Sequence, residues 1–225
     1  MSLNLQASIM WRLKPIRGGQ VLLRNAQVYR NFSQTSRRSA RSFELNTGAR
    51  IPATGLGTFQ DANAQEDTVC KALQRGLRLI DTARVYDVER QVGKGIKRSG
   101  VGRSEIFVAT KLWCSEFHPE DVERALDNSL HELDTDYVDL FMMHYPCTFA
   151  RGAERFPRDS DGRMIHGKTT FVDTWKALEA VVKTGKAKAI GVSNFSKGEI
   201  QTLLEKCSTV CTSLVHSGSG RVDKI

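Results

Sequence analysis

Between residues 54 and 206 the chain alternates short apolar segments with longer helical patterns, and this alternation limits the fold more than any other feature. The apolar segments predict strands over residues 54–57, 79–81, 106–110, 138–143 and 187–192. The amphipathic patterns predict helices over residues 64–75, 89–98, 119–133, 173–184 and 197–206. The connections are long enough to join parallel strands, so the pattern predicts an α/β fold. Periodicity alone does not separate a doubly wound sheet from a barrel.

A small hairpin precedes this alternation. Residues 43–45 and 50–52 are short strand-like segments, and Asn46, Thr47 and Gly48 between them are typical turn residues. We expect the hairpin to cap the fold that follows.

The net charge of +8 is confined to one end of the chain. Residues 1–43 carry eight basic side chains and no acidic one, which leaves 25 basic and 25 acidic residues in the remainder. A balanced remainder offers no excess of cations to neutralise phosphates, so we expect no nucleic-acid partner.

The N-terminal segment 1–41 has the composition of a mitochondrial presequence, because it is rich in arginine and serine and lacks acids. Residues 30–36 resemble a matrix-processing site with Arg30 two residues before the cut. This predicts a mitochondrial matrix protein. Two alternatives stay open: a disordered leader, or an upstream start that does not belong to the protein, which would leave it cytoplasmic.

Metal, disulfide and membrane-spanning roles have no support in the sequence. The five cysteines show no zinc-ligand spacing, and their odd number argues against a disulfide framework, so we expect reduced thiols. His144 has no second ligand at metal spacing. No apolar run approaches the roughly 20 residues that span a bilayer.

Polar residues of catalytic type follow four successive predicted strands. The second strand leads to Asp81 and Tyr86, the third to Lys111, the fourth to His144, and the fifth to the pair 193–194. One such residue alone is usually a helix cap, a solvated side chain or part of the structure. Barrel enzymes, however, build their active sites at the carboxyl ends of the strands. Polar residues at the same end of four successive strands therefore indicate an active site.

These segments, in this order and spacing, resemble the aldo-keto reductase family over residues 43–206. The resemblance implies a (β/α)8 TIM barrel, of which residues 42–206 supply about five β/α units of an NADP-dependent oxidoreductase domain. Residues 207–225 lose the periodicity, and we expect them to lie outside the domain. The family's contacts to the 2′-phosphate of NADPH would follow the seventh strand, beyond residue 225.

The resemblance also implies the role of each residue. The catalytic tetrad falls on Asp81, Tyr86, Lys111 and His144. The cofactor contacts fall on Gly57, Thr58, Asp81, Ser193 and Asn194, and the substrate contacts on Phe59, Trp113, Tyr145 and His144. Many relatives have Trp where this chain has Phe59 and Tyr145, and Asp87 and Val88 replace a more polar pair. These departures concern the shape of the pocket.

The chemistry of the tetrad can be stated from the residues themselves. Hydride transfer to a carbonyl leaves an alkoxide, so a proton donor must lie close to the oxygen, and Tyr86 is the candidate. We expect the Lys111 ammonium to lower the pKa of Tyr86 and Asp81 to hold that ammonium by an ion pair. His144 would orient the carbonyl and donate to its oxygen.

The sequence therefore predicts NADPH-dependent reduction of small aldehydes or ketones, or oxidation of the matching alcohols and polyols, by a monomer. Neither the dinucleotide-binding nor the P-loop glycine motif is present, which agrees with a barrel reductase. The sequence does not choose among substrates, directions, or NADPH and NADH. A catalytically inactive fragment or an interaction subunit remains the alternative.

Overall fold

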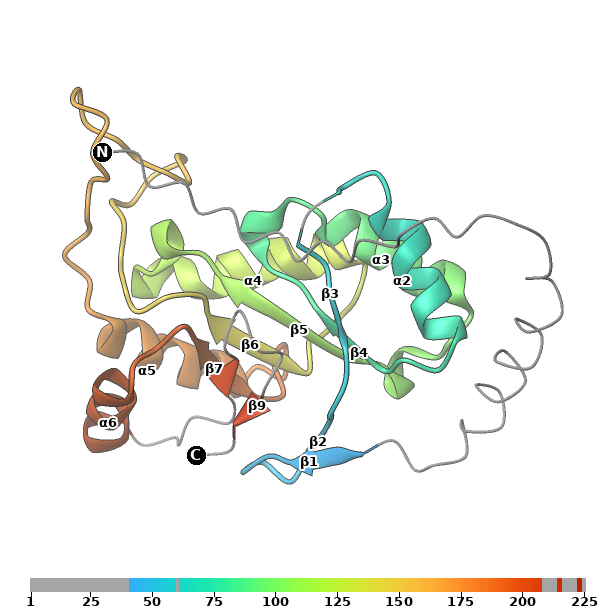
Figure 1. The fold of residues 1–225 in the computed structure, drawn as a ribbon. Helices are drawn as coiled ribbons and strands as arrows, with labels where there is room; N and C mark the ends of the chain where they lie inside the picture. The colour runs from blue at the N-terminus through green and yellow to red at the C-terminus, as the bar shows by residue number, and fades with distance from the viewer. Residues whose placement is uncertain (1–40, 60, 208–213, 216–221, 224–225) are drawn as a thin grey trace, which may run out of the picture. The chain divides into compact units, whose positions relative to one another are not determined.

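A parallel sheet forms the centre of the computed structural model, which describes residues 41–59, 61–207, 214–215 and 222–223. Its strands are β3 (Leu56–Gly57), β4 (Leu79–Asp81), β5 (Phe107–Leu112), β6 (Leu140–Met143), β7 (Ile190–Ser193), β8 (Leu214–Val215) and β9 (Val222–Asp223). They are ordered consecutively, and all neighbours from β3 to β8 are parallel (Figure 1). A doubly wound sheet reverses its strand order, whereas a barrel does not. The order therefore fits part of a barrel and confirms the predicted α/β class.

Five helices connect these strands. They are α2 (Gln65–Gln74), α3 (Glu89–Ser99), α4 (Pro119–Leu133), α5 (Phe171–Val182) and α6 (Lys197–Lys206). Three short 3₁₀ turns, η2 (Arg84–Tyr86), η3 (Arg103–Glu105) and η4 (Cys114–Glu116), lie in the loops. None of the helices described is long and apolar enough to cross a membrane.

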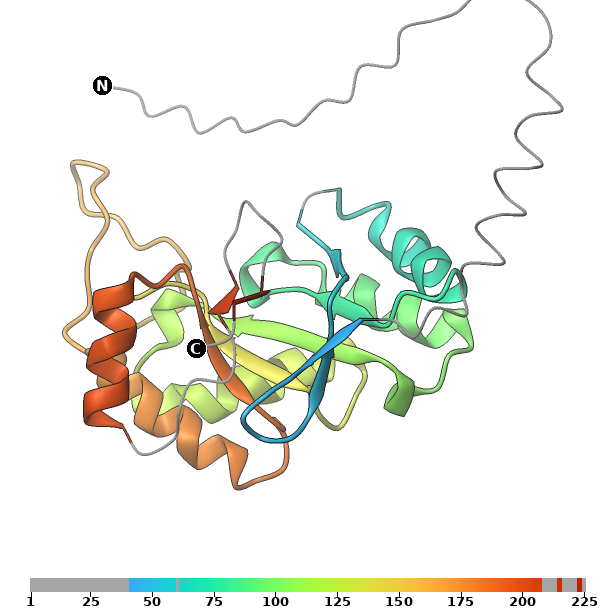
Figure 2. The same cartoon turned by 60° about the horizontal axis from the view of Figure 1, so that its bottom comes forward.

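The side chains on the two faces of the sheet pack into two different hydrophobic cores. Ile80, Val108, Phe141 and Ile190 pack with the helices. Alternate residues of the same strands, such as Leu79, Phe107 and Leu140, point to the other face, as the period of a strand requires. The predicted hairpin, β1 (Ser42–Glu44) and β2 (Arg50–Pro52), is confirmed; it lies at the lower end of the strands in Figure 1 and comes to the front in Figure 2. Its Leu45 and Ile51 close the second core at the amino ends of the strands.

Helix starts follow from capping residues. Thr170 accepts a hydrogen bond from the Asp173 amide, so α5 begins at Phe171, two residues earlier than the pattern predicts. Ser196 and Glu199 form the equivalent box before α6. The strand predicted from residue 54 begins only at Leu56 in β3.

The sheet gains a further strand beyond residue 206. Val192 pairs with Leu214 and Ser193 with Val215, so β8 extends the sheet within residues 207–225. The sequence pattern does not predict this pairing. The predicted leader and its processing site fall almost entirely on residues 1–40, which lie outside the described residues.

Candidate active site

The predicted catalytic residues lie at the carboxyl ends of adjacent strands. Asp81 is the last residue of β4, Lys111 is the penultimate residue of β5, and His144 follows β6 directly. Ser193 ends β7. Because neighbouring strands are parallel and in register, these four positions meet at one edge of the sheet, opposite the hairpin.

The buried Lys111 forms an ion pair with the partly buried Asp81 at this edge. The Lys111 Nζ atom lies 2.7 Å from Asp81 Oδ1 and donates a second hydrogen bond to the Thr82 carbonyl oxygen at 2.9 Å. Only 2% of Lys111 is exposed. A buried ammonium is stable only when it is paired and hydrogen-bonded, and both conditions are met here.

Tyr86 lies beside this pair, at the end of the turn η2. Lys111 Nζ is 5.4 Å from the centre of the Tyr86 ring, and the His144 ring centre is 5.5 Å from it. The phenol, the ammonium and the imidazole are thus neighbours, as the sequence predicts for a tetrad.

The pKa of Tyr86 differs from the expectation. Burial raises this pKa, and the Asp81 carboxylate and Tyr145 raise it further. The expected lowering by Lys111 is therefore wrong, because Asp81 compensates the ammonium charge and the loss of hydration dominates. The Tyr86 hydroxyl stays protonated at neutral pH.

His144 is buried and uncharged. Burial lowers its pKa to about 3, and the nearby Lys111 charge acts in the same direction. Its Nδ1 atom has no hydrogen-bond partner, and its ring stacks on Tyr145 with centres 5.0 Å apart. A neutral imidazole keeps one N–H group that can donate to a ligand.

Residues from β3 and β7 border the same edge. The Thr58 amide donates to the Asp81 carbonyl oxygen at 3.0 Å, and Gly57 has open space where a Cβ atom would project. Asn194 adopts a left-handed backbone with φ of 61°, and its Nδ2 atom donates to the His144 carbonyl oxygen at 2.9 Å and to Ser193 Oγ at 3.0 Å. These contacts bring all five predicted cofactor residues to the strand ends.

An aromatic wall stands beside the tetrad, with Trp113 at its centre. Trp113 is 7% exposed and packs edge-on against His144 and Tyr145, with ring centres 5.3 Å and 6.1 Å apart. Phe59, 65% exposed, contacts the Tyr86 ring instead, with centres 5.1 Å apart. The predicted substrate residues therefore form two groups, one on each side of Tyr86 and His144.

The long loop between β6 and α5 adds residues that the sequence pattern does not identify. Phe149 and Phe156 pack against Trp113 at 5.8 Å and 5.3 Å between ring centres. The Trp113 Nε1 atom donates to the Arg155 carbonyl oxygen at 2.7 Å. The loop lacks helical or strand periodicity. Its only signal is a set of aromatic residues after the carboxyl end of a strand.

Asp87 and Arg155 tie this loop to the turn that carries Tyr86. The Arg155 guanidinium donates to both carboxylate oxygens of Asp87, with Nη2 to Oδ1 at 2.5 Å. Asp87 has a left-handed backbone with φ of 58°, which turns it out of η2. Asp87 thus supplies an ion pair next to the site.

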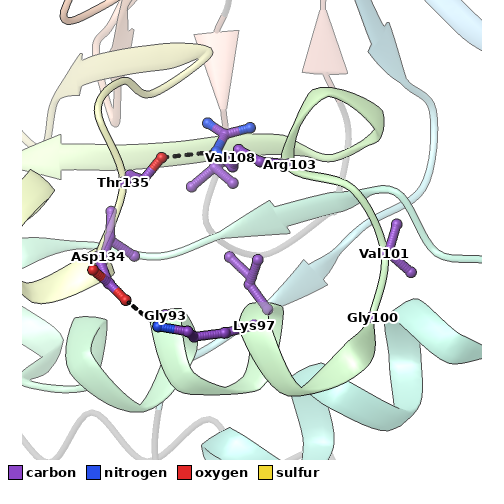
Figure 3. A pocket seen from close by; sticks show the side chains of 10 residues that line it. Gly93, Lys97, Gly100, Val101, Arg103, Val108, Asp134 and Thr135 are labelled. Atoms are coloured by element: carbon purple, nitrogen blue, oxygen red, sulfur yellow. Dashed lines mark hydrogen bonds and ion pairs between the residues drawn. The ribbon is translucent and has the colours of Figure 1, made fainter.

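A separate pocket of about 400 Å³ lies between the end of α3 and the start of β5. Lys97 and Asp134 form an ion pair there at 3.2 Å, and Arg103 lies on the far side (Figure 3). None of the tetrad residues lines this pocket. It is therefore distinct from the strand-end site.

Comparison with known proteins agrees with this arrangement. The model of the Aldo/keto reductase family matches residues 48–219. The chain belongs to the aldo/keto reductase family. Within that family it is 47% identical over 166 residues to aldo-keto reductase family 1 member A1 of Xenopus tropicalis, covering 71% of this chain and 51% of that protein. It is 43% identical over 164 residues to the uncharacterized oxidoreductase C26F1.07 of Schizosaccharomyces pombe, covering 72% and 51%.

A solved structure of this family has the same fold. The aldose reductase of Schistosoma japonicum superposes with a TM-score of 0.76 at 35% identity, covering 79% of this chain and 60% of that one. This aldo/keto reductase chain therefore spans about half the length of the curated relatives it matches. The predicted family and the partial barrel are both confirmed.

Proposed function

We propose that this aldo/keto reductase domain reduces small aldehydes or ketones by hydride transfer from NADPH and oxidises the matching alcohols in reverse. The observation that carries the proposal is the meeting of Tyr86, Lys111 and His144 around one point at the strand ends. The bound cofactor supplies the hydride. The protein's own residues supply the proton and the orientation.

Tyr86 is the proton donor in this proposal. Its hydroxyl is protonated at neutral pH, since the pKa of a phenol lies well above 7 and burial raises it further. An alkoxide is a far stronger base than a phenolate, so proton transfer from Tyr86 to the reduced substrate is favourable despite the raised pKa. The Lys111 ammonium, 5.4 Å from the ring centre, stabilises the phenolate that remains.

His144 positions the carbonyl. We assign the donating N–H group to Nε2, because Nδ1 is buried without a hydrogen-bond partner. A neutral imidazole donates without placing a second positive charge beside Lys111. The rings of Trp113 and Tyr145 on one side hold the imidazole plane in place.

The nicotinamide end of the cofactor fits the opposite side of the site. Ser193 and Asn194 offer hydroxyl and amide groups suited to a carboxamide, and Gly57 leaves room for a ring or ribose where a side chain would otherwise project. Thr58 and Asp81 complete this side. We propose NADPH as the cofactor on the family resemblance, and a small carbonyl compound or polyol as the substrate.

The alternative, an inactive fragment or an interaction subunit, makes a different prediction in one experiment. Residues 42–206 are joined to the remaining β/α units of the Xenopus tropicalis relative, and NADPH consumption is followed with a panel of aldehydes. The proposed function predicts steady turnover of carbonyl compounds by the chimera. A folded chimera that binds NADPH and turns over no carbonyl compound would favour the interaction subunit.

A further inference from the structure

Two cysteine sulfurs lie close together in the loops that follow β5 and β6. The Sγ atoms of Cys114 and Cys147 lie 3.9 Å apart. Cys114 is fully buried and follows Trp113, whereas Cys147 is half-buried and lies three residues after His144. The Phe149 amide donates to the Cys114 carbonyl oxygen at 3.0 Å, which holds the two loops side by side.

The geometry allows a covalent bond between these sulfurs. A disulfide bond is about 2.05 Å long, so the sulfurs need to approach by about 1.9 Å from their present 3.9 Å. Side-chain rotation of two cysteines, with a small movement of the loop that carries Cys147, can provide this approach. Within the described part of the chain, no cysteine sulfur is paired in this way with Cys70 or Cys207.

The two thiols differ in acidity in the direction that such a reaction needs. The hydrogen bond between the two thiols lowers the pKa of Cys147. The same bond, together with burial, raises the pKa of Cys114. The thiolate therefore resides on the more accessible sulfur, where it can meet a reagent from solvent. Burial raises the pKa of Cys207, which makes that half-buried thiol a suitable reference.

We propose that Cys147 and Cys114 form a peroxide-oxidised cysteine pair, with Cys147 as the attacking residue and Cys114 as the resolving residue. The Cys147 thiolate attacks one oxygen of hydrogen peroxide, the O–O bond breaks, and hydroxide leaves and takes a proton to become water. The Cys114 thiol then loses its proton and attacks the Cys147 sulfenic acid, and a second water leaves as the S–S bond forms. Two thiols lose two electrons, and one peroxide becomes two waters.

The disulfide would join the loop after β5 to the loop after β6. These loops carry Trp113 and His144, so the bond fixes the aromatic wall relative to the tetrad. The proposal does not rest on carbonyl reduction, because the two sulfurs react with peroxide whether or not the site turns over substrate.

Peptide mapping tests the pair on the reduced 225-residue chain. Trypsin cleaves after Lys111, Arg124 and Arg151, which places Cys114 in residues 112–124 and Cys147 in residues 125–151, one cysteine in each peptide. After a stoichiometric dose of hydrogen peroxide and alkylation of the remaining thiols, mass spectrometry should find these two peptides linked. Cys147 should react about tenfold faster than Cys207, as measured by dimedone trapping.

Variants and denaturant separate the pair from general oxidation. Cys207→Ser should form the link as the wild type does, and Cys147→Ser should not form it. Cys114→Ser should accumulate dimedone-labelled Cys147, because the serine hydroxyl can keep the hydrogen bond to Cys147 while no resolving thiol remains. In urea the preference for this link should disappear. The proposal is overturned if the native chain yields both peptides unlinked and alkylated while Cys207 is oxidised, or if links to other cysteines form equally fast.

Discussion

The Lys111 Nζ atom lies 2.7 Å from Asp81 Oδ1, so the charge of the ammonium beside Tyr86 is already compensated by a carboxylate before any ligand binds. This relationship explains why the pKa of Tyr86 is raised by burial and not lowered by the neighbouring cation. The buried phenol thus stays protonated for donation, and the ion pair holds the ammonium in place to stabilise a phenolate that forms during turnover.

Replacing Lys111 by methionine should remove most of the activity of the chimera described above. The phenolate that forms during turnover loses its nearest cation, and the Asp81 carboxylate beside it loses its partner. The measurement is kcat for aldehyde reduction at neutral pH. Near-parental kcat in the variant would show that Lys111 does not stabilise the Tyr86 phenolate.

The buried His144 should make the fold sensitive to acid. Its native pKa is about 3, whereas an unfolded histidine titrates near 6.5, so the unfolded chain binds a proton that the native chain does not over this range. Stability is therefore lost as the pH falls below about 6.5, by about 2 kcal/mol between pH 6.5 and pH 5 from this residue alone.

Urea unfolding at pH 7 and pH 5 measures this effect. His144→Gln should lose about 2 kcal/mol less between the two pH values than the wild type. His166→Gln changes an exposed histidine on the loop after β6, and it should keep the wild-type difference. Equal acid sensitivity in wild type and His144→Gln would contradict a neutral, buried imidazole.

The Asp87–Arg155 ion pair should act on substrate binding more than on chemistry. Arg155→Ala frees the loop that carries Phe156 and leaves Trp113 with a less ordered partner for its indole N–H. We expect KM for aromatic aldehydes to rise severalfold in the chimera, with kcat changed less. Arg158→Ala, on the same loop but bonded only to the Gly162 carbonyl oxygen, is the matched control. A fall in kcat with unchanged KM would show that Arg155 acts on the chemical step and not on substrate binding.

The N-terminal segment can be tested apart from the enzyme. Residues 1–41 fused to a fluorescent reporter should direct it to mitochondria and be shortened there, because the segment is basic and free of acids. Arg30→Ala should slow the cut or move it. A full-length reporter spread through the cytosol would favour a leader without targeting function.

Much of the fold and the tetrad could be predicted because they depend on order along the chain. A polar residue after each apolar strand, such as Asp81, His144 or Asn194, must reach the same edge once the strands are parallel. The hairpin around Gly48 followed from its turn residues in the same way.

The remaining features depend on distances that a linear pattern does not contain. The raised pKa of Tyr86 follows from its burial and from the Asp81 carboxylate nearby. Phe149 and Arg155 lie in a loop without periodicity, and the contact between Cys114 and Cys147 joins positions 33 residues apart. Pairing of β8 with β7 likewise has no signal in the sequence.

The central claim, that the Tyr86 hydroxyl donates the proton, is tested most directly by Tyr86→Phe in the chimera. The substitution removes one oxygen and keeps the ring that packs against His144 and Phe59. The account predicts that aldehyde reduction falls by at least about a hundredfold, the lower range for a positioned general acid, while the Kd for NADPH stays within about twofold. Retention of near-parental kcat with unchanged NADPH binding would contradict it.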